Sequence, residues 1–183
     1  MRVIAGKARS LRLKTVETMA TRPTTDRIKE TLFNMLQPYI RACRFLDLFA
    51  GSGGIGIEAL SRGADKAVFA DNNREAVKCI QDNLAFTRLA PQAEVYQSEA
   101  VFVLRSLEGK PPFDFIFMDP PYDKGLEQEV LTYLAQSSLM DEDTVVIVEA
   151  SLQTEFAYLE DLQMELYKEK KYKTNKHAFI RRV

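Results

Sequence analysis

Short apolar runs recur along the middle of the chain and alternate with longer amphipathic stretches. The apolar runs are rich in Val, Ile and Phe, and they predict β-strands over residues 44–49, 66–71, 93–98, 113–119 and 144–150. The stretches between them have apolar residues at helical spacing and predict helices over residues 54–62, 74–87, 100–107 and 126–136. Strands that alternate with crossover helices predict an α/β domain with a parallel sheet covered on both faces.

The pattern changes at both ends of the chain. Beyond residue 160, QMELYKEKKYK and HAFIRRV flank the turn-like KTNK and predict an antiparallel hairpin at the edge of the sheet. Near the start, TTDRIKETLFNML predicts a helix with Thr24 or Thr25 as its N-cap and with Ile28, Leu32, Met35 and Leu36 on its buried face. We therefore divide the chain into an N-terminal extension, residues 1–43, and a main domain, residues 44–183.

The composition favours one intracellular domain. The chain has 183 residues, 46% of them hydrophobic, which is enough for one core, and we expect a monomer. The first ten residues carry charge, and no run reaches the roughly 18 apolar residues of a spanning helix, so we expect a cytoplasmic protein without a membrane partner. Cys43, Cys79 and the single His177 lack metal-ligand spacing, so we expect buried, reduced cysteines and no metal site.

The formal net charge of −1 hides a strong segregation of charge along the chain. Residues 1–44 hold ten Lys and Arg against three Asp and Glu, and residues 167–183 hold seven against one. Residues 45–166 hold eight basic residues against 22 acidic ones. Two basic ends that flank an acidic body indicate a polyanion held across one face, and nucleic acid is the expected partner.

A glycine-rich segment, DLFAGSGGIGIEAL, follows the first predicted strand. Gly51, Gly53 and Gly56 have the G-x-G-x-x-G spacing, which allows a tight turn and aims a helix N-terminus at a ligand. Asp71 ends the second predicted strand, where a carboxylate can bind ribose hydroxyls. These features fit a dinucleotide as well as another nucleoside, whereas the missing Gly-Lys-Ser/Thr sequence excludes a Walker-type phosphate loop.

Asp47 shifts the interpretation towards S-adenosylmethionine. It lies inside the first predicted strand, where burying a carboxylate is costly unless a cation or a hydrogen-bond donor meets it. The methionine ammonium of S-adenosylmethionine would be such a partner, whereas a pyrophosphate would be repelled. An ion pair or cap within the protein is the alternative explanation for Asp47.

The segment Asp119-Pro120-Pro121-Tyr122 ends the fourth predicted strand and should face the same crevice as Gly51 and Asp71. The prolines fix the backbone and remove two N–H donors. The Asp119 carboxylate and the Pro120 carbonyl could accept both hydrogens of an exocyclic amino group and orient its lone pair, while Tyr122 stacks on the base. The segment therefore predicts a clamp for a flat, amino-bearing ring.

The motifs together resemble a known family. FLDLFAGSGGIGIEALSRGA and MDPPY resemble the Rossmann-like class I methyltransferases that act on exocyclic amino groups. The stretch from RVIAGKARSLRLKT to RPTTDRIKETLFNML is similar to the RsmD family of bacterial 16S rRNA guanine-N2 methyltransferases. The resemblance implies a seven-stranded, mostly parallel sheet with the last strand antiparallel, S-adenosylmethionine as cofactor, and 16S rRNA within an assembling small ribosomal subunit as partner.

The resemblance also implies roles for individual residues. Asp47, Ala50, Gly51, Ser52 and Gly53 would line the methionine end of the cofactor, Asp71 and Asn72 the ribose, and Glu99 and Ala100 the adenine, with Glu99 in place of the more common Asp. An N-terminal hairpin would grip RNA, and we assign Arg2, Lys7, Arg9, Arg12 and Lys14 to phosphates. Arg22, with Pro23 and Thr24, would close over the cofactor or contact the RNA backbone.

Three other functions stay open at this point. The same clamp would suit N6-adenine or N4-cytosine methylation of another RNA or of DNA, although the chain has no obvious large target-recognition domain. A nicotinamide-dependent oxidoreductase would share the glycines and Asp71 but would leave Asp47 and the Asp119–Tyr122 segment unexplained. A non-enzymatic RNA-binding module would need only the basic ends.

Overall fold

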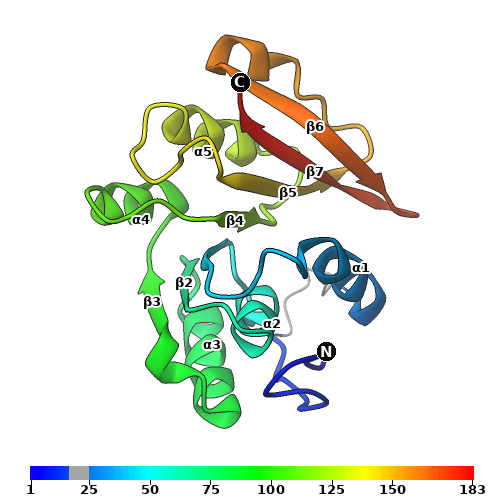
Figure 1. Cartoon of the computed structure of the whole chain (residues 1–183), viewed down its shortest axis with the longest axis vertical. Helices are drawn as coiled ribbons and strands as arrows, with labels where there is room; N and C mark the ends of the chain where they lie inside the picture. The colour runs from blue at the N-terminus through cyan, green and yellow to red at the C-terminus, as the bar shows by residue number, and fades with distance from the viewer. Residues whose placement is uncertain (17–24) are drawn as a thin grey trace.

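A seven-stranded sheet with helices on both faces forms the body of the protein (Figure 1). The structure is a computed structural model, and it describes residues 1–16 and 25–183. The strands are β1 (Arg44–Leu48), β2 (Lys66–Asp71), β3 (Ala93–Gln97), β4 (Phe115–Met118), β5 (Val145–Ser151), β6 (Met164–Lys171) and β7 (Asn175–Arg182). The helices are α1 (Asp26–Leu36), α2 (Gly54–Ser61), α3 (Arg74–Thr87), α4 (Ala100–Leu107) and α5 (Leu126–Leu134), with 3-10 turns at Ala90–Gln92 and Ala157–Leu162. None of the helices in the described residues is long and apolar enough to span a membrane.

The strand order is β3-β2-β1-β4-β5-β7-β6, and β7 runs opposite to both of its neighbours. The other neighbouring strands pair in parallel. The chain leaves β1 for β2 on one side and later returns to β4 on the other side, so the strand order reverses between β1 and β4. In open α/β sheets such a switch point opens a ligand crevice at the carboxyl ends of the strands.

Side chains of each central strand alternate between two hydrophobic clusters. Leu46 and Leu48 of β1 face the cluster that includes α4 and α5, whereas Phe45 faces the cluster that includes α1, α2 and α3. Helices therefore cover both faces, which explains why the central strands β1, β4 and β5 are apolar along most of their length. Asp47 lies on the Phe45 face, because side chains of a strand alternate.

The predicted elements are confirmed with small shifts at their ends. α3 and α4 have the predicted bounds, and β4 is shorter than predicted at both ends. β7 begins at Asn175, inside the segment predicted as a turn, because Asn175 to His177 pair with β5 and β6. Cys43 and Cys79 are buried and form no disulfide, as expected.

The buried face of α1 differs from the prediction. Thr25 is the N-cap, but Lys29 and Phe33 are buried with Leu32 and Leu36, while Ile28 and Met35 are only partly buried. Glu58 of α2 accounts for the burial of Lys29, since their charged groups lie 3.4 Å apart and Glu58 also pairs with Arg62. The predicted buried face omits Lys29, but the buried carboxylate of Glu58 compensates its charge and allows it to lie in the interior.

The N-terminal segment packs on α2. The backbones of Val3 and Leu11 hydrogen-bond, and Arg2 and Arg12 form an antiparallel bridge, so the chain doubles back as a short hairpin. The Glu58 carboxylate accepts from the Ile4 and Ala5 N–H groups at 2.8 and 3.0 Å. The same buried glutamate therefore ties together α1, α2 and the N-terminal hairpin.

Candidate active site

The loop after β1 turns sharply to begin α2. Phe49, Gly51 and Gly53 have φ angles of 58°, 56° and 77°, a region that favours glycine. A side chain at Gly51 would meet open space, whereas a Cβ at Gly56 would lie 2.3 Å from the Phe69 ring. The glycines thus have different roles, because Gly51 leaves room above the loop and Gly56 allows α2 to pack on β2.

A first pocket, here called the β1 pocket, opens beside this loop at the switch point. It has a volume of about 100 Å³, and its lining includes Asp47, Ala50, Gly51, Ser52 and Asp119. Gly53, predicted with them, does not line it and serves instead as the N-cap of α2. Lys29, Met1, Thr15 and Val16 also line the pocket, so the N-terminal segment and α1 form part of its wall.

Asp47 is buried at the base of the β1 pocket. Its Oδ2 accepts a hydrogen bond of 2.8 Å from the Gly56 N–H. Burial raises the pKa of Asp47 to about 8, an effect that the Gly56 N–H reduces and the negative charge of Asp71 increases. A cation placed in this pocket would favour the ionised carboxylate, because it would offset the cost of burying the charge.

A second pocket, the β2 pocket, lies at the carboxyl ends of β2 and β3. It has a volume of about 140 Å³ and is lined by Asp71, Asn72, Glu99 and Ala100, with apolar walls that include Val101 and Leu126. The Asp71 carboxylate accepts from the N–H groups of Gly51 and Asn73 at 2.8 and 2.9 Å. Phe49 lines both pockets, so the residues predicted for the two ends of the cofactor lie on either side of one aromatic ring.

The segment Asp119–Tyr122 leaves β4 at the edge of the β1 pocket. Asp119 is partly buried, Pro120 is buried, and Pro121 and Tyr122 are exposed. The pKa of Asp119 lies well above its usual range, because burial and the negative charges of Glu149 and Asp47 disfavour the carboxylate. Tyr122 is 42% exposed, as expected of a ring available to stack on a ligand.

A polar network beside Asp119 was missed by sequence reasoning. Glu149 of β5 and His177 of β7 are paired across the sheet, with their side-chain atoms 3.1 Å apart, and His177 also contacts the Tyr172 hydroxyl at 3.2 Å. The Asn175 amide donates to the other oxygen of Glu149 and lies beside the Tyr122 hydroxyl. The available signal was Glu149 itself, an acidic residue near the end of an apolar run, as Asp119 is at the end of the preceding one.

Carboxylates from three neighbouring strands therefore gather on one face of the sheet. Asp47 is paired with Phe117, and Phe117 with Ile147, so these three residues face the side of the sheet covered by α1 and α2. Asp119 and Glu149 each follow by two residues and therefore lie on the same side. Among the described residues no group of three or more His, Cys, Asp or Glu is arranged to hold a metal ion. The site instead offers acceptors and negative charge to an organic cation or to N–H donors.

Five of the six predicted RNA-contacting residues lie on the N-terminal hairpin and are exposed, namely Arg2, Lys7, Arg9, Arg12 and Lys14. Arg2 pairs with Asp26 at 3.1 Å and Lys14 with Asp82 at 2.8 Å, so protein carboxylates partly neutralise these two. Lys7, Arg9 and Arg12 project from the surface. Arg22, Pro23 and Thr24 lie outside the described residues.

The comparisons with known proteins agree with this geometry. A family described as conserved hypothetical protein 95 matches residues 1–181. The chain belongs to this family. It is also 37% identical over 150 residues to ribosomal RNA small subunit methyltransferase D of Haemophilus influenzae, which covers 81% of this chain and 78% of that one. The resemblance to the RsmD family is thereby confirmed.

Solved structures of similar proteins have the same fold as this chain. The Escherichia coli protein yhhF is 32% identical, with a TM-score of 0.84 and coverage of 100% of this chain and 97% of that one. A ribosomal protein L11 methylase from Lactobacillus delbrueckii has the same fold at 16% identity, with a TM-score of 0.64 and coverage of 85% and 80%. The seven-stranded sheet of this family member is therefore the Rossmann-like class I methyltransferase fold, as predicted.

Proposed function

We propose that the protein transfers a methyl group from S-adenosylmethionine to the exocyclic N2 amino group of a guanine in 16S rRNA. The observation that carries this proposal is the position of Asp119, at the edge of the β1 pocket and beside the exposed Tyr122. The relative from Haemophilus influenzae, named as a ribosomal RNA small subunit methyltransferase, supports the choice of rRNA.

The residues of the two pockets fit S-adenosylmethionine. Asp47 would face the methionine ammonium, directly or through water, at a loop where Ala50, Gly51 and Ser52 leave backbone groups accessible. Asp71 and Asn72 would bind the ribose hydroxyls, and Glu99 with Ala100 would meet the adenine. When bound, the cofactor supplies a methyl carbon made electrophilic by its sulfonium, and the nearby carboxylates would stabilise that cation.

The segment Asp119–Tyr122 would hold the acceptor. The lone pair of a purine amino group is delocalised into the ring, so the nitrogen must be oriented before it can attack. The Asp119 carboxylate and the Pro120 carbonyl would accept hydrogen bonds from the two N–H groups and direct the nitrogen lone pair at the methyl carbon. Tyr122 would stack on the base. As the N–C bond forms and the S–C bond breaks, the amino group acquires a positive charge, and Asp119 would accept the released proton.

Residues 1–43 would serve as an extension that covers the cofactor and contacts RNA. Met1, Thr15, Val16 and Lys29 in the wall of the β1 pocket support the covering role. The exposed Lys7, Arg9 and Arg12 support contact with phosphates, together with Arg2, Lys14 and Arg22. The substrate would be rRNA within an assembling small subunit, the enzyme would act as a cytoplasmic monomer, and no metal would be required.

The test is methyl transfer from labelled S-adenosylmethionine to small-subunit particles and to free rRNA from cells lacking this protein, with nucleoside analysis. We expect labelled N2-methylguanosine, and the preferred substrate form shows when in assembly the enzyme acts. Label in methyladenosine or methylcytidine would show that the acceptor base is adenine or cytosine, and the proposed role of Asp119–Tyr122 would stand. No label in any RNA, or a melting temperature raised by NADH but not by S-adenosylmethionine, would overturn the proposal.

A further inference from the structure

A third and larger depression, here called the hairpin groove, lies next to the proposed acceptor site. Its volume is about 930 Å³, and its walls come from the start of α1, from Tyr122 and Glu149, and from Lys170–Asn175 at the tip of the β6–β7 hairpin. Figure 1 shows this tip extending beside α1, on the same side of the molecule. The groove therefore leads from the exposed ring of Tyr122 to the outer edge of the sheet.

The mouth of the hairpin groove is basic. Arg27, Lys170, Lys171 and Lys173 line the groove, and among the described lining residues Glu149 is the only acidic one. Lys171 pairs with Glu169 at 3.2 Å, whereas Arg27, Lys170 and Lys173 form no ion pair with any residue in the part of the chain that the structure describes. These cations are accordingly less neutralised than Arg2 and Lys14 of the N-terminal hairpin.

The inner end of the groove holds an unsatisfied acceptor. Asn175 is 6% exposed, and within residues 1–16 and 25–183 its Oδ1 accepts no hydrogen bond, although its amide group donates to Glu149. A buried carbonyl oxygen without a donor is destabilising, so it indicates a donor supplied by a ligand. Asn175 lies beside Tyr122, where a stacked base would place its edge.

We propose that the hairpin groove binds the RNA strand that carries the target base. Arg27, Lys170 and Lys173 contact the phosphates that flank the target nucleotide, and Asn175 Oδ1 accepts a hydrogen bond from the edge of the base. In guanine the donor beside the N2 amino group is N1–H, which adenine and cytosine lack. The inference deepens the proposed function, on which it rests, by adding an RNA site separate from the N-terminal hairpin and a residue that selects guanine.

A single RNA strand fits the groove better than a protein segment does. Unpaired lysines and an arginine around two tyrosines, Tyr122 and Tyr172, are the combination that binds phosphates and stacks bases. The hydroxyls of Thr25 and Thr174 add further donors for phosphate oxygens. A helix of a partner protein would need a groove lined by aliphatic side chains, and Ile28 is the only aliphatic residue among the described residues that line this groove.

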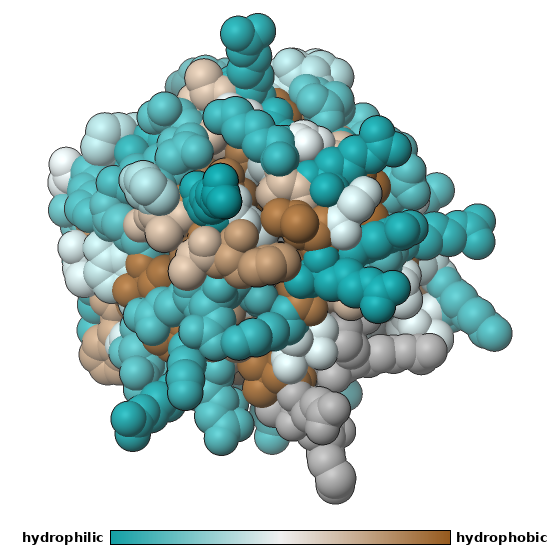
Figure 2. Space-filling view, turned by 90° about the horizontal axis from the view of Figure 1, so that it is seen from below, coloured by the Kyte–Doolittle hydropathy of each residue, from teal (hydrophilic) through white to brown (hydrophobic). Residues whose placement is uncertain are grey.

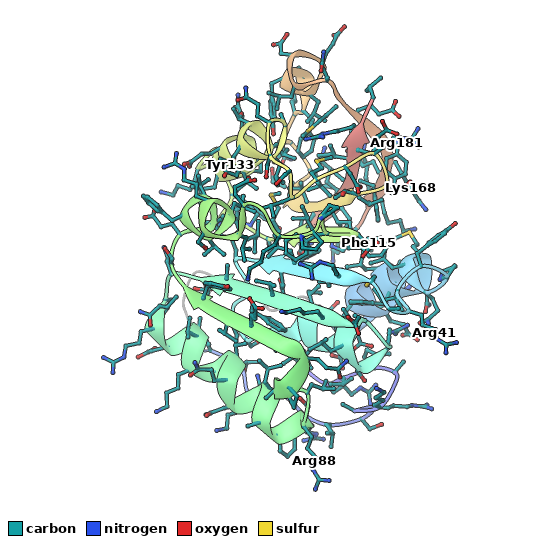
Figure 3. All side chains as sticks on the ribbon, turned by 60° about the vertical axis from the view of Figure 1, so that its left-hand side comes forward. Arg41, Arg88, Phe115, Tyr133, Lys168 and Arg181 are labelled. Atoms are coloured by element: carbon teal, nitrogen blue, oxygen red, sulfur yellow. The ribbon has the colours of Figure 1, made fainter. Side chains whose placement is uncertain are left out.

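The phosphate contacts are tested by Lys170→Glu/Lys173→Glu. The matched control is Arg88→Glu/Arg105→Glu, which changes the charge equally at two exposed positions, the C-cap of α3 and a residue of α4. Figure 3 shows Arg88 at the end of α3, at the opposite end of the molecule from Lys168 and Arg181 of the β6–β7 hairpin. We expect the groove variant to raise the KM for RNA at least about tenfold and to lower the salt slope of RNA binding by about 1.4, with S-adenosylmethionine affinity unchanged.

The base contact is tested with Asn175→Leu and an acceptor RNA that carries 2-aminopurine in place of the target guanine. 2-Aminopurine keeps the amino group but has no N1–H. The wild-type enzyme should prefer guanine about tenfold or more in kcat/KM, as expected when a buried polar group is left unpaired. Asn175→Leu should lose that preference, which a merely structural role for Asn175 would leave intact.

The outcomes separate this inference from the function on which it rests. An inactive wild-type enzyme on rRNA overturns the proposed function. If the wild-type enzyme is active but the Lys170→Glu/Lys173→Glu variant has the same KM and salt slope as the control variant, the proposed phosphate contacts of the groove are overturned. Equal use of guanine and 2-aminopurine by the wild-type enzyme overturns the role of Asn175.

Discussion

At the scale of single residues, the main feature of the site is a group of carboxyl groups whose pKa values are raised by burial. Burial raises the pKa values of both Asp47 and Asp119, and the neighbouring Glu149 raises the pKa of Asp119 further. Such a cluster is costly for an isolated protein and favourable for one that binds a cation. A sulfonium and an ammonium on the same ligand would supply that compensation.

Asp119 can be tested apart from cofactor binding. We expect Asp119→Asn to lower kcat about 100-fold or more, because an amide cannot take up the proton and places a donor against the amino group. The dissociation constant of S-adenosylmethionine, measured by calorimetry, should change little. Asp123→Asn is the matched control, since Asp123 is exposed and asparagine tolerates its φ of 60°. A kcat close to that of the wild type would remove Asp119 from the mechanism.

Asp47 should make stability depend on pH. Its pKa is about 8 in the folded protein and about 4 in an unfolded chain, so between these pH values the folded state holds a proton that the unfolded state has lost. Stability conferred by that proton is present below pH 4 and is lost as the pH rises to 8, at up to about 1.4 kcal/mol per pH unit. Asp47→Asn should reduce this slope in urea unfolding, and an unchanged slope would contradict the assignment.

Tyr122 should act through its ring rather than its hydroxyl. We expect Tyr122→Phe to keep most of the activity and Tyr122→Ala to raise the KM for RNA about fivefold or more, because a stacked base contributes about 1–3 kcal/mol. Steady-state kinetics with saturating S-adenosylmethionine distinguishes the two variants. Equal losses in both would assign the role to the hydroxyl, which lies beside Asn175.

The sequence predicted the parts of the site that lie within one continuous segment. Asp119–Tyr122 and the glycine loop are local motifs, so their spacing alone indicated where they lie. Glu149, Asn175 and His177 are brought together by the antiparallel pairing of β5 with β7, and no local pattern sets that register. An acidic residue near the carboxyl end of an apolar strand was the one clue that could have extended the prediction.

At the scale of elements, hydrophobic patterning predicted the strands better than the faces of helix α1. The central strands β1, β4 and β5 are buried on both sides, so their apolar runs are unambiguous. On α1, the buried Lys29 ammonium group pairs with Glu58 of α2 and donates to the Arg2 carbonyl oxygen, and both contacts depend on tertiary packing. A lysine can be an interior residue here because the carboxylate compensates its buried charge, and removing either partner would leave the other charge uncompensated.

The contact between α2 and β2 gives a prediction about glycine. A Cβ at Gly56 would lie 2.3 Å from the Phe69 ring, which is fixed in the core, whereas a Cβ at Gly54 would lie 2.1 Å from the Met1 sulfur, at the end of a flexible side chain that can move away. We expect Gly56→Ala to lower the free energy of unfolding by about 1–3 kcal/mol through overpacking. Gly54→Ala, at the first residue of the same helix, should be neutral or stabilising. Equal unfolding midpoints in urea for both variants would show that β2 and α2 can separate at little cost.

At the scale of the whole molecule, the segregated charges of the sequence become two basic regions. The N-terminal hairpin packs on α2 below α1, and the β6–β7 tip extends beside α1 on the same side of the molecule (Figure 1). On the face seen from below, hydrophilic side chains surround small apolar areas (Figure 2). Such a surface suits a charged polymer better than an apolar partner.

If one RNA contacts both basic regions, their contributions should add. Arg9→Glu/Arg12→Glu should weaken RNA binding and lower its salt slope, as Lys170→Glu/Lys173→Glu should, and the combined variant should show the sum of the two free-energy losses. Additivity is expected because, among the described residues, no ion pair or side-chain hydrogen bond joins Arg9 or Arg12 to Lys170 or Lys173. Binding titrations at several salt concentrations measure it. A combined variant no weaker than the groove variant alone would show that the N-terminal hairpin stays free of RNA and that residues 1–43 serve the cofactor site instead.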